Sequence, residues 1–168
     1  MRRDPVPSML LSALCLGLLL FLLPPPSYSW KGTVVTVQDG DTLIVSCKSD
    51  HTRIRLYGVD APEHGQAFGR KARNYLTDLV RRKTVDVEPL DTDSYERSVA
   101  LVRLEDGTLV NQALINAGFA WVYTRYCTQP QCLEWKRLEG DARAGRRGLW
   151  KDKRPVPPWI WRKTHPEE

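Results

Sequence analysis

The sequence is poor in the residues that bind zinc. It has three histidines and four cysteines in 168 residues, and the histidines are scattered, so no Cys and His spacing indicates a zinc site. No internal repeat is visible, which argues against a repeat architecture. Neither a zinc enzyme nor a repeat protein is therefore predicted.

An apolar run long enough for a typical membrane span is also lacking. Residues 9–23 are apolar, about fifteen residues against the roughly 20 that a spanning helix needs. Two arginines precede the run and small serines follow it, a pattern typical of a secretory signal peptide. We predict a leader over residues 1–29 that is cleaved before Trp30. An uncleaved membrane anchor is the alternative, and bulky Leu14 before Cys15 disfavours lipidation.

Residues 30–150 form one predicted domain, followed by a proline- and tryptophan-rich tail over residues 151–168. A chain of this size can bury roughly two thirds of its unfolded surface, so we expect a monomer. Without the leader, 23 basic and 19 acidic residues remain. This modest positive excess fits a polyanionic partner, although many proteins that bind no nucleic acid share it. The tail is expected to pack against the domain, because exposed tryptophans are sticky.

Export would place the cysteines in an oxidising compartment. Cys127 and Cys132 flank a turn-prone tetrapeptide, which favours a local disulfide over two free thiols. Cys47 ends an apolar alternating run and is predicted to be a buried, unpaired core residue.

Apolar and β-branched residues follow strand-like patterns between turn-prone Asp-Gly and Ser-Asp pairs. The predicted strands cover residues 33–37, 42–47, 52–57, 84–88 and 99–104. The predicted helices cover residues 66–80, 109–117 and 131–144. This order favours a mainly β, α+β fold: a five-stranded OB-type Greek-key barrel with about three helices.

Three short segments concentrate carboxylates and arginines: residues 39–41, 55–63 and 95–97. Carboxylates can hold a hard divalent cation and activate water, and arginines can clamp a phosphate as charge develops on it. Together these residue types predict phosphodiester cleavage.

In order and spacing, these segments resemble the staphylococcal nuclease (thermonuclease) family over residues 32–150. The matching motifs are VQDGDTL at 37–43, VDAPE at 59–63, QAFG at 66–69 and RRGLW at 146–150. The resemblance implies the same OB-type fold and a calcium-dependent nuclease that cuts DNA and RNA to 3′-phosphorylated products.

Asp41 and Asp60 match the family's calcium ligands. The resemblance also implies that the backbone carbonyl of Ala61 binds the metal, and Pro62 would keep Ala61 extended. Oxygen ligands alone would also admit magnesium or manganese. Asp39 is interpreted as a turn residue.

Glu63 matches the carboxylate assigned to water activation, and Arg55 and Arg97 match the two phosphate-binding arginines. Planar guanidinium groups suit phosphate oxygens better than lysines do. Arg53 lies on the same side of its strand as Arg55. Its spacing to the VDAPE motif does not match that of the phosphate-binding arginine, so Arg53 is interpreted as a solvated charge.

Glu96 departs from the family, which usually has glycine between the tyrosine and the arginine. Its β-carbon and carboxylate put the position of Arg97 in question. Asp93 and Tyr95 match positions that help bind the nucleotide, with a structural role equally compatible. Tyr126 is a weaker candidate for base stacking, near Tyr123.

The sequence therefore predicts a secreted or periplasmic, calcium-dependent nuclease with single-stranded DNA and RNA as substrates and no stable membrane association after leader cleavage. A non-catalytic nucleic-acid-binding OB module is the alternative. A cell-surface enzyme held by an uncleaved leader would share the chemistry and differ in location.

Overall fold

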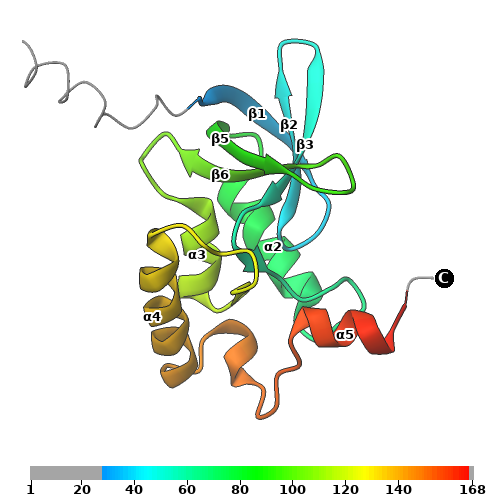
Figure 1. Cartoon of the computed structure of the whole chain (residues 1–168), viewed down its shortest axis with the longest axis vertical. Coiled ribbons are helices and arrows are strands. Elements are labelled where there is room, and N and C mark those ends of the chain that lie inside the picture. The colour runs from blue at the N-terminus through cyan, green and yellow to red at the C-terminus, as the bar shows by residue number, and fades with distance from the viewer. Residues whose placement is uncertain (1–27, 167–168) are drawn as a thin grey trace, which may run out of the picture.

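The computed structural model describes residues 28–166, so the predictions for the leader lie almost entirely outside the described residues. Five strands close into a barrel in the order β1-β2-β3-β6-β5, with the helices gathered at one end (Figure 1). The barrel strands are β1 (Trp30–Val37), β2 (Thr42–Cys47), β3 (Asp50–Leu56), β5 (Thr84–Thr92) and β6 (Ser98–Leu104). The predicted α+β barrel is confirmed.

The barrel encloses an apolar core because alternate residues of each strand point inward. Leu43, Val45, Ile54 and Val87 are all fully buried. Neighbouring strands are antiparallel except for β3 and β6, which run parallel and close the barrel. Pairing of β2 with β3 sets Thr42 opposite Arg55, and this register brings the turn before β2 to the end of β3.

Within the described residues, four helices accompany the barrel, together with a 3-10 turn and two short strands. They are α2 (Gly69–Val80), α3 (Val110–Ala117), α4 (Gln131–Ala144), α5 (Pro158–Thr164), η1 (Gly148–Lys151), β4 (Val59–Asp60) and β7 (Trp121–Val122). The helix predicted from residue 66 begins later, because Phe68 takes a left-handed conformation with φ 69°. Within residues 28–166, no helix is both long and apolar enough to cross a membrane.

The tail packs against the domain, as predicted. Helix α5 places Trp159 parallel to Tyr123, with ring centroids 5.4 Å apart, and edge-on to Trp121 at 5.7 Å. A helix of seven residues has little stability of its own, so contacts with the domain, including this aromatic packing, hold α5 in place.

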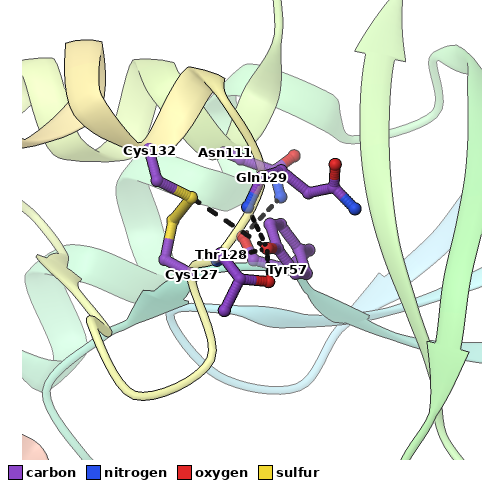
Figure 2. The surroundings of a disulfide bond; sticks show 6 residues. All are labelled: Tyr57, Asn111, Cys127, Thr128, Gln129 and Cys132. Atoms are coloured by element: carbon purple, nitrogen blue, oxygen red, sulfur yellow. Dashed lines mark hydrogen bonds between the residues drawn. A yellow bond between two sulfur atoms is a disulfide. The ribbon is translucent and has the colours of Figure 1, made fainter.

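Cys127 and Cys132 form the predicted disulfide. Figure 2 shows that the loop they close is bound to Tyr57, whose hydroxyl accepts hydrogen bonds from the backbone amides of Thr128 (2.7 Å) and Gln129 (3.0 Å). Because Tyr57 lies between β3 and β4, the disulfide loop braces the turn that leads to the VDAPE motif. Cys47 is free but only half-buried at the end of β2, so its predicted full burial was wrong.

Candidate active site

The turn before β2 holds the first of three acidic side chains that converge. Asp39 caps this turn by accepting a hydrogen bond from the backbone amide of Asp41 at 2.9 Å, in accord with its interpretation as a turn residue. Asp41 is 6 % exposed. Its Oδ2 accepts a hydrogen bond from the backbone amide of Ala61 at 2.7 Å. This bond links two of the predicted metal ligands, Asp41 and Ala61.

Arg55 holds the two buried aspartates together. Its Nη1 lies 3.1 Å from Asp41 Oδ2, and its Nη2 lies 3.0 Å from Asp60 Oδ1. Burial raises the pKa of Asp41 well above its ordinary value, and the charge of Arg55 only partly opposes this effect. A cation at this point therefore favours the charged form of Asp41.

The donor set suits a hard divalent cation. Asp41 and Asp60 contact one guanidinium group, so their oxygens are close to each other, and carboxylate oxygens are the ligands that calcium and magnesium prefer. No group of three or more His, Cys, Asp or Glu side chains within residues 28–166 is placed to hold a metal. The two aspartates would thus need backbone oxygen and water to complete the coordination shell.

Glu63 lies in a tight turn beyond the aspartates. Gln66 closes this turn: its Oε1 accepts a hydrogen bond from the Glu63 amide at 3.1 Å. Gly69, the first residue of α2, packs directly against the Glu63 backbone, and a β-carbon there would overlap the Glu63 carbonyl oxygen. The glycine of the QAFG motif is thus required for the position of Glu63.

Arg162, from α5, is the site residue that the sequence did not reveal. Its guanidinium bonds both oxygens of Asp60, at 3.2 and 2.8 Å, and also donates to Glu63 Oε1. Partial burial disfavours the charged form of Arg162 and so lowers its pKa. The hydrogen bonds and charges of Asp60 and Glu63 outweigh this effect, and the pKa of Arg162 is raised. It lies 102 residues from Asp60 in the chain, and no local pattern marks it.

Arg97 lies apart from the carboxylates and is fixed by Asp93. Asp93 Oδ2 accepts from Arg97 Nε at 2.7 Å, and Oδ1 accepts from the backbone amides of Tyr95 and Arg97, each at 3.0 Å. The parallel register sets Arg55 opposite Val99, and Arg97 directly precedes β6, which begins at Ser98. Asp93 is therefore a positioning residue for Arg97.

Glu96 takes the left-handed conformation that glycine favours, with φ 60°. The loop thus keeps a glycine-like backbone despite the substitution, and Arg97 remains bonded to Asp93. A non-glycine residue in this region costs about 1–2 kcal/mol.

Glu96→Gly is accordingly expected to raise the free energy of unfolding by about 1 kcal/mol, because glycine relieves the backbone strain. Urea denaturation measures the effect. Glu105→Gly is the matched control: Glu105 is exposed in a turn but outside the left-handed region, so its replacement should lower stability. An equal loss in both variants would contradict a strained Glu96.

Asp93→Asn is expected to destabilise the protein more at pH 7 than at pH 3. Partial burial raises the pKa of Asp93, but hydrogen bonds from Arg97 and Tyr95 outweigh burial and lower it below the ordinary 3.8. Because the pKa of Asp93 is lower in the folded than in the unfolded protein, its carboxylate stabilises the fold at pH values above the unfolded-state pKa. This stabilisation is lost as the pH falls through the folded-state pKa. Urea denaturation at both pH values measures the difference, with Asp91→Asn as control. A pH-independent loss would refute the assignment.

The predicted aromatic candidates differ in their surroundings. Tyr95 is 73 % exposed, with the Arg97 guanidinium 5.3 Å from its ring centroid. Tyr126 is 55 % exposed and meets Tyr123 edge-on at 4.9 Å. Beside this pair, an open cavity of about 520 Å³ is lined by Tyr123, Thr124, Arg125, Trp159, Arg162 and Lys163. Its cations and rings are the groups that bind phosphates and bases.

Arg53 takes no part in the site. Its Nε donates to Gln38 Oε1 at 2.7 Å on the exposed surface. The structure thus separates Arg53 from Arg55 as the sequence predicted.

Comparison with known proteins agrees with this geometry. The sequence profile described as "Staphylococcal nuclease homologue" matches residues 53–152. A protein named "Uncharacterized endonuclease" from Escherichia coli O157:H7 is 44 % identical over 147 residues, covering 88 % of this chain and 94 % of its own. A "Micrococcal nuclease" from Shigella flexneri is 36 % identical, covering 92 % of each chain. Helix α5 lies beyond the profile match.

Proposed function

The chain belongs to the staphylococcal nuclease family, and we propose that it is a calcium-dependent nuclease that hydrolyses DNA and RNA to 3′-phosphorylated products. The observation that carries the proposal is the convergence of Asp41, Asp60 and Glu63 around arginine side chains at one end of the barrel. A binding module has no use for three carboxylates beside a phosphate site, because they repel the ligand.

Asp41 and Asp60 would hold the calcium ion, with the backbone carbonyl of Ala61. Calcium held by these groups would supply Lewis-acid chemistry, lowering the pKa of water and neutralising charge on the phosphate. Glu63 lies in the neighbouring turn, where its carboxylate can orient water and accept its proton at Oε1 or Oε2. Glu63 is half-buried, and the hydrogen bond from its amide to Gln66 holds its backbone in this turn.

Arg55 and Arg97 would both stabilise the phosphate. Arg55 is held beside the proposed metal ligands by its ion pairs with Asp41 and Asp60, and its planar guanidinium suits phosphate oxygens. Arg97, held by Asp93, would meet the leaving 5′ oxygen.

The strand would continue into the cavity beside Tyr123. Arg125 and Lys163 line this cavity, and neither forms an ion pair with another described residue. Single-stranded nucleic acid binds such combinations of cations and aromatic rings with little sequence preference.

We further propose that the protein acts outside the cytoplasm as a monomer. The leader pattern of residues 1–29 supports export, and the Cys127–Cys132 disulfide is suited to an oxidising compartment.

One observation favours the alternative of a non-catalytic binding module: Arg162 covers Asp60 and Glu63. Cleavage of a fluorescent single-stranded DNA with calcium, and then with chelator, separates the two. Calcium-dependent products that carry 3′-phosphate ends support the nuclease. Products with 5′-phosphate ends would reject the proposed bond cleavage, and binding without cleavage under calcium, magnesium and manganese would establish the module.

A further inference from the structure

Arg162 and Arg55 together occupy most of the acceptor positions of the Asp60 carboxylate. Both Asp60 oxygens accept hydrogen bonds from Arg162, and Oδ1 also accepts one from Arg55 at 3.0 Å. The Asp60 side chain is 1 % exposed, so there is no free face on which a cation can bind it. A divalent ion that binds Asp60 must displace a guanidinium group.

Of the two arginines, Arg162 is the one that can leave. Arg55 is 13 % exposed and is fixed by its place in β3 and by bonds to both Asp41 and Asp60. Arg162 is 43 % exposed, on a long side chain that borders the open cavity. Its guanidinium can move toward solvent without moving the barrel.

Contacts elsewhere on the tail deliver Arg162 to this position. Trp159 stacks on Tyr123, one helical turn before Arg162. Upstream of α5, the Val156 carbonyl accepts a hydrogen bond from Gln66 Nε2 at 2.6 Å. Gln66 also bonds the Glu63 amide, so one side chain ties the tail to the turn that holds Glu63.

We propose that Arg162 is a further functional residue of this site, an internal cation that neutralises Asp60 and Glu63 and competes with the divalent ion for Asp60. It thereby sets the metal concentration at which the enzyme works and keeps the carboxylates paired until metal arrives. The inference rests on the proposed function for the metal site. It assigns to the C-terminal tail a role that residues 53–152 cannot supply.

A purely structural ion pair would behave differently. If Arg162 only fastened α5, its loss would lower stability and leave metal affinity unchanged or weakened. Under competition, its loss removes a positive charge and a displaceable ligand, so metal affinity rises. The two readings therefore predict opposite changes in calcium binding.

Calorimetric titration of the purified protein with Ca²⁺, without nucleic acid, tests the inference. For Arg162→Gln we expect the calcium Kd to fall by about tenfold, equivalent to about 1.4 kcal/mol. Lys153→Gln is the matched control, since it removes the same charge from an exposed position of the tail, where Lys153 forms no ion pair within residues 28–166, and its Kd should stay close to that of the wild type. Arg162→Lys should fall between the two.

An equal or higher Kd in Arg162→Gln would overturn the proposal, provided that thermal unfolding shows both variants to be folded. Arg162→Lys keeps the test decisive if the glutamine variant does not fold. Tighter calcium binding by the variant without cleavage by either protein would uphold the inference and reject the nuclease. If the wild type cleaved DNA and the variant bound calcium with unchanged affinity, the nuclease would be supported and the inference on Arg162 rejected.

Discussion

Replacing Glu63 with glutamine is expected to reduce kcat by about 10²–10⁴-fold, the usual contribution of a positioned general base. Glutamine keeps the shape of the side chain and can still accept a hydrogen bond from Arg162, so the turn closed by Gln66 should be preserved. The substitution removes the ability to take a proton from water, together with the negative charge that pairs with Arg162. Cleavage of single-stranded DNA under saturating calcium measures kcat, and fluorescence anisotropy measures binding.

Glu105→Gln provides the control for Glu63, because Glu105 is an exposed glutamate in the turn after β6. Its substitution should change neither kcat nor DNA affinity. If Glu63→Gln weakened binding as much as it lowered kcat, the carboxylate would act in substrate binding, and its assignment as the base would be wrong.

Replacing Arg55 with glutamine is expected to have the largest effect on stability. Arg55 pairs with Asp41 and Asp60, which are 6 % and 1 % exposed. Removing one partner of a buried ion pair typically costs about 3–5 kcal/mol, because the remaining charge is left uncompensated. Urea denaturation in the presence of chelator, which keeps metal from replacing the missing cation, measures the loss.

Arg53→Gln is the matched control for Arg55, since the two arginines lie on the same side of β3 two residues apart. Arg53 is exposed and contacts Gln38, so its replacement should change stability by no more than about 0.5 kcal/mol. Comparable losses in the two variants would show that the buried pairs contribute nothing specific. The Arg55 variant should also lose cleavage activity, whereas the Arg53 variant should keep it.

Much of the fold can be predicted from the sequence, because most strands and helices are specified by local patterns of residues. Alternation of apolar residues predicts the barrel strands, with β1 and β5 extending beyond the predicted ends where cross-strand pairing continues. The strands β4 and β7 have two residues each, too few for any period to be read. Helix α5 begins at Pro158, just after Pro155 and Pro157, and has no clear apolar stripe, so only its contacts with Trp121 and Tyr123 reveal it.

The sequence by itself determined which candidate site residues lie close together. Asp41, Arg55, Asp60 and Glu63 lie within 23 positions of one another, in motifs whose spacing is kept by adjacent strands and a single turn. The disulfide likewise joins cysteines five residues apart. Short loops restrict how far such groups can separate, which is why their proximity could be predicted.

Only the tertiary structure decided what surrounds those residues. Arg162 reaches Asp60 from 102 positions away because Trp159 packs on Tyr123 and Gln66 binds the tail, and each of these contacts depends on the closed barrel. Glu96 keeps a glycine-like backbone because Asp93 accepts hydrogen bonds from the amides on either side of it. Long-range packing and backbone conformation are properties of the folded chain as a whole, so residue order alone does not disclose them.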